Sequence, residues 1–306
     1  MSNPTVDILM ATYNGEQYIA DQIKSIQSQS YQDWRLLVSD DCSIDNTVEV
    51  IKKFAERDSR IHVISEGVRH GGAKENFMSL VTRSTAAYAM FSDQDDVWKP
   101  FKIEHLVGCA NYIGDKQPLL VFSDMQTVND DLSVIAESFM DYSGLDPYKT
   151  TLNSLLALNC VPGCTTLMNR ELVKCLNSVP APKEMTMHDA WCALVAASIG
   201  RIYYTDERTI SYRQHGDNDI GAKGYIKAIK AGMFDSTRHK TLIGTVYQAQ
   251  ALLRAFGSRM PEEKRRVVEV YSALNRMTKI ERIACLTKYG FWKYGTARKI
   301  DQLLNL

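Results

Sequence analysis

Three carboxylates stand within four residues at Asp93, Asp95 and Asp96, in the segment SDQDD at residues 92–96. Carboxylates this close repel one another unless a cation or hydrogen-bond donors offset their charge. If the segment follows a strand, Asp93 and Asp95 point to the same side. Their oxygen atoms then suit Mg²⁺ or Mn²⁺ held together with a diphosphate. Taken alone, the segment fits a solvated acidic loop before a helix at Pro100 equally well.

Other polar residues could bind a nucleotide or move a proton, and each has a structural alternative. Asp41 could accept a hydrogen bond from a base or ribose, or close a turn toward Ser43. Tyr13 could stack on a base or fill a gap in the core. Asp189 begins an apolar helix, where it could be a general base or only favour the helix dipole. His215 could bind a metal, but a lone histidine is more often structural.

Lys74 follows two glycines, Gly71 and Gly72, and could approach a phosphate. The glycine-rich motifs GxGxxG and GxxxxGK[ST] do not occur, which makes dinucleotide binding and P-loop chemistry poor alternatives. The HExxH motif of zinc proteases and the GxSxG motif of serine hydrolases are also absent.

Strands that alternate with helices must position these residues in the first half of the chain. The pattern predicts strands at 6–11, 34–39, 61–65, 88–92 and 119–123, and helices at 18–29, 47–57, 73–84 and 100–113. Such alternation predicts an α/β fold with an open, mostly parallel sheet and helices on both faces. Ligands of these sheets bind beyond the carboxyl ends of the strands. Polar residues follow three of the predicted strands at 12–14, 40–41 and 93–96.

The second half of the chain has a looser pattern and then becomes helical. We expect helices at 152–158, 171–177 and 188–199, and strands at 165–169, 202–204 and 209–212. Beyond Lys223 the expected helices are 225–231, 241–256, 262–285 and 291–304. Residues 223–306 carry 17 Lys and Arg against 6 Asp and Glu, a net of +11, so residues 1–222 carry −11. This division predicts a domain over residues 1–222 and a basic helical C-terminal extension over residues 223–306.

The basic extension mixes aromatic residues with cations, as in KYGFWKY at residues 288–294. It could lie on an anionic membrane, or pack as a helical subdomain with a solvated basic face. Nucleic acid is not expected, because it would leave the acidic clusters without a role. We expect neither a secretion signal nor a membrane span, because residues 1–6 lack a basic region before an apolar run and no run of eighteen apolar residues occurs. Seven cysteines without a CxxC pair predict free thiols in a reducing compartment, so we expect a cytoplasmic protein, at the inner face of the plasma membrane if the extension binds lipid.

Three motifs occur in order, ILMATYNG at 8–15, LVSDDCSIDNT at 37–47 and FSDQDDVWKP at 91–100. Together they resemble the inverting family 2 glycosyltransferases with a GT-A fold, over about residues 5–222. The third motif and YRQH at 212–215 are most similar to bacterial rhamnosyltransferases of cell-wall or O-antigen polysaccharide synthesis. The resemblance implies transfer of a sugar from a dTDP-, UDP- or GDP-linked donor to a saccharide or lipid-linked acceptor. It divides the catalytic domain into a nucleotide-sugar half over about residues 1–130 and an acceptor half over about 131–222.

The resemblance also implies roles for single residues. Tyr13 and Asp41 would hold the base, and Asp93 would contact the ribose or a metal-bound water. Asp95 would bind Mg²⁺ or Mn²⁺, and Asp189 would be the general base. Further residues are implied at the nucleotide site (Thr12, Asn14 and Lys74), in the metal shell (His215) and in the loop near the acceptor (Pro162, Gly163 and Cys164).

Two residues depart from the family pattern. Cys42 stands where the family usually has glycine, which puts the geometry of that turn in question. His188 stands where the family often has glutamate before the base, which leaves the surroundings of Asp189 open.

Two other functions explain the same residues less well. A sugar nucleotidyltransferase would usually carry a glycine-rich phosphate loop near its N-terminus, and TYNG at 12–15 is not one. A non-catalytic nucleotide-sugar-binding module would not need Asp93, Asp95 and Asp189 to be intact.

Overall fold

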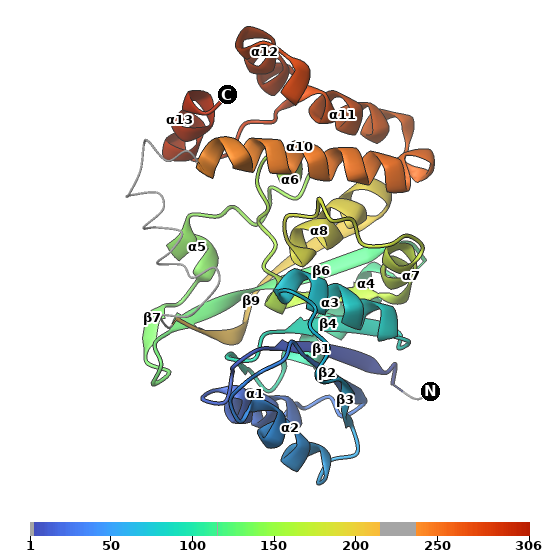
Figure 1. Ribbon diagram of the computed structural model, residues 1–306, viewed down its shortest axis with the longest axis vertical. Coiled ribbons are helices and arrows are strands. Elements are labelled where there is room, and N and C mark those ends of the chain that lie inside the picture. Colours follow the sequence, from blue (N-terminus) through green and yellow to red (C-terminus); the bar gives the residue numbers. More distant parts are fainter. Residues whose placement is uncertain (1–2, 115, 215–236) are drawn as a thin grey trace.

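The computed structural model describes residues 3–114, 116–214 and 237–306. In Figure 1 a twisted sheet runs through the middle of the molecule, with helices on both sides and C-terminal helices across one end. The strands are β1 (Val6–Thr12), β2 (Trp34–Asp40), β3 (Ile61–Ser65), β4 (Tyr88–Ser92), β5 (Val97–Trp98), β6 (Leu119–Val128), β7 (Val134–Ala136), β8 (Thr166–Asn169) and β9 (Arg201–Arg213).

The helices confirm the predicted alternation in the first half of the chain. They are α1 (Ile19–Gln27), α2 (Thr47–Ala55), α3 (Ala73–Arg83), α4 (Lys102–Ile113), α5 (Phe139–Ser143), α6 (Leu152–Ala157), α7 (Arg170–Asn177), α8 (His188–Ile199), α10 (Thr237–Phe256), α11 (Glu262–Ser272), α12 (Lys279–Tyr289) and α13 (Thr296–Leu304).

The sheet has the order β3-β2-β1-β4-β8-β6-β9-β5, and β7 pairs with β6 outside this path. Strands β3, β2, β1 and β4 are parallel, as are β6 and β9. Strand β8 lies antiparallel between β4 and β6. The long registers are the parallel ones, so the predicted α/β class with a mostly parallel sheet is confirmed.

Alternate residues of the strands face two separate cores. In β1, Ile8 and Met10 belong to the core under α1, α2 and α4, whereas Leu9 belongs to the core under α3, α7 and α8. Strands buried on both faces have continuous apolar sequences rather than alternating ones. Each fully buried Leu, Ile or Met contributes about 1.5–3 kcal/mol. Helices therefore cover both faces of the sheet, as predicted.

The C-terminal helices share the second of these cores. Phe256 of α10 packs against Trp191 of α8, with ring centroids 6.1 Å apart. Tyr271 of α11 and Phe291 are completely buried and pack edge to face at 4.9 Å. The described C-terminal helices are therefore packed onto the α/β part of the chain. Over the described residues, no helix is both long and apolar enough to cross a membrane.

Several predicted boundaries are wrong, and each has a local cause. The helix predicted at 262–285 is two helices, because Leu274 is buried in a short 3-10 turn and Thr278 starts α12 with a capping box to Glu281. The strands predicted at 202–204 and 209–212 are one strand, β9. The helix predicted at 291–304 begins only at Thr296. The helix predicted at 225–231 lies outside the described residues.

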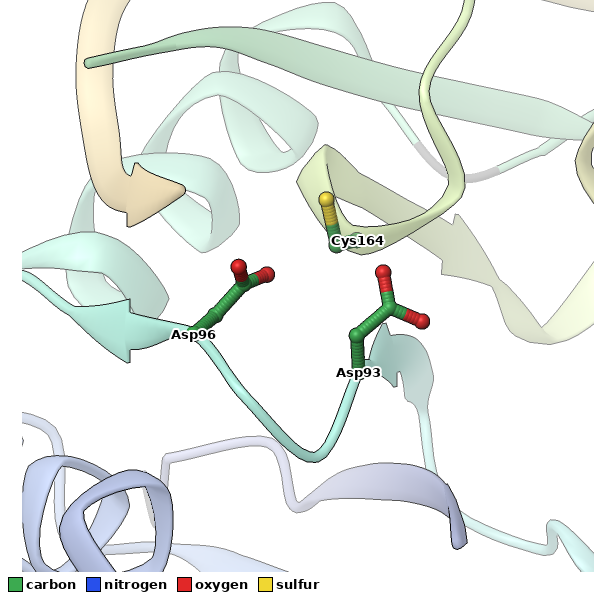
Figure 2. A group of neighbouring side chains, drawn as sticks. All are labelled: Asp93, Asp96 and Cys164. Carbon is green, nitrogen blue, oxygen red and sulfur yellow. The ribbon is translucent and has the colours of Figure 1, made fainter. Parts of the chain in front are cut away.

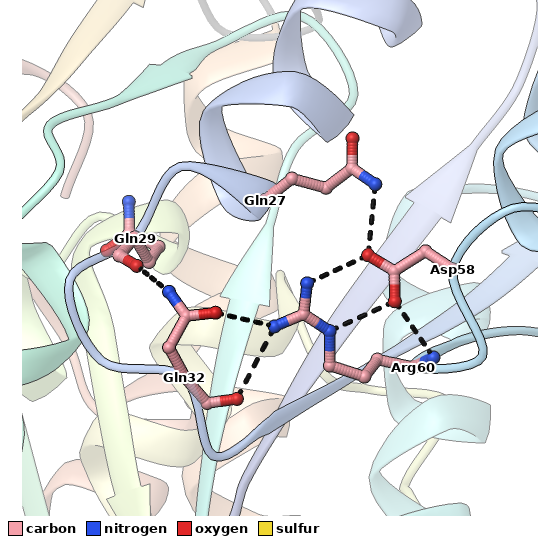
Figure 3. A network of polar contacts seen from close by, with 5 residues as sticks. All are labelled: Gln27, Gln29, Gln32, Asp58 and Arg60. Carbon is pink, nitrogen blue, oxygen red and sulfur yellow. Dashed lines mark hydrogen bonds and ion pairs between the residues drawn. The ribbon is translucent and has the colours of Figure 1, made fainter.

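A network of polar side chains lies at the end of the sheet where β2 and β3 begin. Arg60 donates hydrogen bonds to Asp58 at 2.8 Å and to the side chain of Gln32 at 2.9 Å, and Gln27 also donates to Asp58 (Figure 3). The Arg60 guanidinium lies 3.8 Å from the centroid of the Trp34 ring. These bonds, above all those from Arg60, lower the pKa of Asp58. The cluster stabilises the edge opposite the carboxyl ends of the strands.

Candidate active site

Two polar loops meet beyond the carboxyl ends of β1 and β2. Thr12 donates a hydrogen bond to the buried carboxylate of Asp40 at 2.9 Å. The backbone amide of Asn14 donates to Ser43 Oγ, and the Asn14 side chain accepts from the amide of Ile44, both at 2.9 Å. These bonds leave the Tyr13 ring half exposed, where it could contact a base.

The turn after β2 contains Cys42, at the position where the family usually has glycine. Cys42 has a φ of 63°, in the left-handed region that favours glycine. The chain therefore keeps the turn that a glycine would form, at some conformational cost.

Asp41 binds the loop that precedes α3. Its carboxylate accepts hydrogen bonds from the amides of His70, Gly71 and Gly72, with a distance of 2.9 Å to the last. Lys74, in the first turn of α3, donates to the carbonyl of Met185 at 3.0 Å and forms an ion pair with Glu75 at 3.4 Å. The structure thus shows positioning contacts for Asp41 and Lys74, and their contacts with a base or phosphate stay predictions.

The turn between β4 and β5 carries the acidic motif. Figure 2 shows Asp93 and Asp96 pointing from this turn toward Cys164 of the neighbouring loop. Ligand atoms of these three residues lie within 4.8 Å of one another. Asp96 is completely buried, and neither of its carboxylate oxygens has a hydrogen-bond partner among the described residues. Burial, together with the charges of Asp95 and Asp93, raises the pKa of Asp96 well above its usual range.

Asp93 is perturbed in the same way. Burial and then the charges of Asp95 and Asp189 raise its pKa to about 7. Ligand atoms of Asp93 and Cys164 lie within 4.8 Å of each other, and the amide of the neighbouring Gly163 donates to Asp189, so the acidic turn and the start of α8 adjoin the same loop. The backbone carbonyl of Asp95 accepts a hydrogen bond from Arg213 at 3.0 Å, which ties the turn to the end of β9.

Lys102 is a member of this site that sequence reasoning missed. Its ammonium is completely buried, donates to the carbonyl of Cys164 at 2.6 Å and lies 3.5 Å from the centroid of the Trp98 ring. Burial lowers the pKa of Lys102 to about 7, while negative neighbours that include Asp96 and Asp93 act to raise it. One signal was available, because a cation at the first residue of a helix is unfavourable to the helix dipole.

Asp189 lies at the start of α8 beside the loop predicted to contact the acceptor. Burial raises its pKa to about 6, against hydrogen bonds from the amides of Ala190 and Gly163. A Cβ atom at Gly163 would lie 3.3 Å from the Cβ of Asp189 and 2.7 Å from a ring nitrogen of His188. The close approach of loop and helix therefore requires glycine at position 163.

His188 packs as an apolar ring behind the candidate base. It stacks on Phe77 at 4.1 Å and meets Phe91 edge to face at 4.8 Å. Burial lowers the pKa of His188 to about 3, so the ring is neutral. Among the described residues, neither ring nitrogen has a hydrogen-bond partner.

The structure brings most of the predicted residues to one rim of the sheet. Asp93 and Asp189 both adjoin the loop that Pro162, Gly163 and Cys164 form. Residues Thr12, Tyr13, Asn14 and Asp41 line the adjacent strand ends, and Asp95 follows in the acidic turn. His215 lies outside the described residues.

Comparison with known proteins identifies the family of the chain. The chain matches glycosyl transferase family 2 over residues 7–176. It is 31% identical to the dTDP-rhamnosyl transferase RfbG of Shigella flexneri, over 72% of this chain and 76% of that protein. It is 30% identical to the β-1,3-glucosyltransferase WfgD of Escherichia coli, which uses UDP-Glc, over 55% of this chain and 61% of that protein.

Solved structures share the fold at low sequence identity. TarS of Staphylococcus aureus in complex with UDP-GlcNAc has a TM-score of 0.60 at 14% identity, over 93% of this chain and 80% of that one. The mannosyltransferase PcManGT of Pyrobaculum calidifontis, with GDP-Man and Mn²⁺, has a TM-score of 0.56 at 15% identity, over 99% and 85%. The chain therefore belongs to glycosyl transferase family 2 and is a nucleotide-sugar-dependent glycosyltransferase with a GT-A fold.

Proposed function

We propose that the protein is a metal-dependent, inverting glycosyltransferase of bacterial surface polysaccharide synthesis. Its donor is dTDP-rhamnose, by analogy with the dTDP-rhamnosyl transferase RfbG. Its acceptor is a saccharide or a lipid-linked saccharide. The observation that supports the proposal is that Asp189, at the start of α8, and Asp93, in the acidic turn, adjoin the same loop at Gly163 and Cys164.

Asp189 is the general base in this proposal. It takes the proton of an acceptor hydroxyl, and the oxygen attacks the anomeric carbon from the face opposite the nucleotide. The bond from that carbon to the diphosphate oxygen breaks, and the nucleoside diphosphate leaves with the electron pair. A pKa of about 6 keeps Asp189 ionised at neutral pH and makes it a stronger base than an exposed aspartate. Such help is worth about 10²–10⁴-fold.

The carboxylates of the acidic turn fit a divalent cation. They are hard oxygen donors, and mutual repulsion at Asp93 and Asp96 is not offset by hydrogen bonds to the buried oxygens of Asp96 among the described residues. Asp95 and Asp93 would hold the ion, with His215 as a further predicted ligand. When bound, the ion supplies positive charge for the departing diphosphate. We propose Mn²⁺ or Mg²⁺, and the PcManGT structure contains Mn²⁺.

A thermal-shift screen with dTDP-rhamnose, UDP-glucose and GDP-mannose, each with and without Mn²⁺, tests donor and metal together. Ligands that bind only the folded state stabilise it by RT ln(1 + [L]/Kd). We expect a shift that needs both Mn²⁺ and the donor, is largest with dTDP-rhamnose, and is lost in Asp95→Ala but kept in the exposed control Asp206→Ala. A shift that ignores Mn²⁺, or survives in Asp95→Ala, would reject the metal role.

The product distinguishes the rival functions. A nucleotidyltransferase would make the nucleotide sugar from a sugar phosphate and a nucleoside triphosphate. A binding module would give the thermal shift without turnover. Release of nucleoside diphosphate on addition of an acceptor is expected only of the transferase.

The last helix offers a surface for a membrane, where lipid-linked acceptors reside. Ile300, Leu303 and Leu304 of α13 are 49%, 40% and 55% exposed, and their spacing places them on one side of the helix together with Lys299. Apolar residues beside a cation are typical of helices that lie in a membrane interface. We propose that α13 contacts the anionic inner face of the plasma membrane from the cytoplasm.

A further inference from the structure

The middle residue of the acidic motif binds the nucleotide loop. Gln94 Oε1 accepts a hydrogen bond from the amide of Tyr13, and Gln94 Nε2 donates to the carbonyl of Tyr13, both at 2.9 Å. One carboxamide thus satisfies both backbone groups of a residue 81 positions away, as a neighbouring strand would. This joins the loop after β1 to the turn after β4.

Gly15 makes room for this contact. A Cβ atom at position 15 would lie 2.3 Å from Gln94 Oε1 and 2.4 Å from its Cδ. The φ of Gly15 lies outside the left-handed region, so its own backbone would accept alanine. Glycine is therefore required here by the Gln94 side chain and not by the turn.

Gly15 is itself held in place from two sides. Its amide donates to Thr47 Oγ1 at 2.7 Å, and its carbonyl accepts from the amides of Tyr18 and Ile19 at 3.1 and 3.0 Å, where α1 begins. These bonds fix the Gly15 backbone to the starts of α1 and α2, so it cannot easily move away from the Gln94 side chain. The Gln94 side chain therefore packs against backbone whose position is fixed.

We propose that Gln94 is a positioning residue that sets the distance between the base-binding loop and the metal-binding turn. The inference rests on the proposed function, in which one donor spans from Tyr13 to Asp95. When the contact is lost, the two ends of the donor site move independently, and part of the binding energy is spent on ordering them. We expect this ordering to weaken donor binding about 10-fold, which corresponds to about 1.4 kcal/mol of binding free energy.

A double-mutant cycle tests the proposal with Gln94→Ala, Gly15→Ala and the double variant. We expect each single variant to raise the donor KM about 10-fold while the acceptor KM stays unchanged. The double variant should be no worse than Gln94→Ala alone, because removal of the carboxamide leaves room for the new methyl group. Gly108→Ala, where a Cβ meets nothing within 4 Å, is the matched control and should leave the donor KM unchanged.

The possible results separate this inference from the proposed function. If the wild type binds no nucleotide sugar in a direct titration, the proposed function fails. If the wild type binds the donor and Gln94→Ala binds it equally well, only the positioning role fails. If the donor KM of the double variant rises by the product of the two single increases, Gly15 and Gln94 act independently, and the proposed coupling between them is wrong. A merely structural role would lower the amount of folded enzyme, and hence the apparent kcat, without changing the donor KM.

Discussion

Asp189→Asn should make the protein more stable while it removes activity. Asparagine has the size of aspartate but no charge to desolvate. Burial raises the pKa of Asp189 from 3.8 to about 6. Each tenfold change in proton affinity is worth about 1.4 kcal/mol, so the buried charge costs up to about 3 kcal/mol. Because the side chain keeps some exposure, we expect a gain of about 1–3 kcal/mol above pH 6.

The pH dependence identifies the source of this gain. Between pH 3.8 and about 6 the folded protein holds a proton that the unfolded chain has released, so the wild type loses stability as the pH rises through this window. The wild type has lost this stability completely above pH 6, whereas the asparagine variant has no carboxyl at position 189 to titrate and loses none. The advantage of Asp189→Asn should therefore grow by up to about 2 kcal/mol from pH 4.5 to pH 8.

Urea unfolding of both proteins in EDTA at the two pH values measures this difference. The exposed control Asp206→Asn should show no such growth. Turnover of Asp189→Asn should fall by at least about 10²-fold while donor binding persists. A variant that is less stable than the wild type at pH 8, or an advantage that is equal at both pH values, would refute the reasoning from desolvation.

Two further predictions concern Lys102 and α13. Lys102→Met removes the buried amino group and should cost about 1–3 kcal/mol in urea unfolding, because it leaves the buried carbonyl of Cys164 without its hydrogen-bond donor. The loss of stability should exceed that of Lys99→Met, three residues away, and an equal loss would contradict the role of the buried Lys102 contact. Ile300→Asp with Leu304→Asp should abolish flotation with vesicles that contain phosphatidylglycerol, whereas Tyr112→Asp on α4 should not. Unchanged flotation of the α13 variant, or none of the wild type, would reject the membrane contact.

The sequence predicts the parallel strands well because both faces of each are buried. Strands β1, β2 and β4 are short apolar runs, and in a chain that alternates such runs with helices they are typical of buried parallel strands. Strand β9 was divided in the prediction because its middle is exposed and polar, with Asp206, Glu207 and Arg208. The antiparallel direction of β8 depends on where its connections cross the sheet, which no local pattern records.

The candidate site shows the same limit at the level of side chains. The acidic turn was predictable because its carboxylates are neighbours in the sequence. The contact of Lys102 with the Cys164 carbonyl joins positions 62 apart, and that of Gln94 with Tyr13 joins positions 81 apart. Such contacts follow from the sheet order, which places β1 beside β4 and β4 beside β8. A pattern of residue types along the chain does not contain them.

The charges of the site bear directly on how a donor can enter. The charges of Asp95 and Asp189 act on Asp93, those of Asp95 and Asp93 act on Asp96, and Lys102 is the buried lysine near Asp93 and Asp96. A nucleoside diphosphate brings at least two further negative charges. At a separation of about 5 Å and an effective dielectric constant of about 20, each like-charge pair costs about 3 kcal/mol. In the proposed function, a divalent cation that binds together with the donor offsets this repulsion. Metal and donor should therefore strengthen each other's binding by the same factor, as linkage requires.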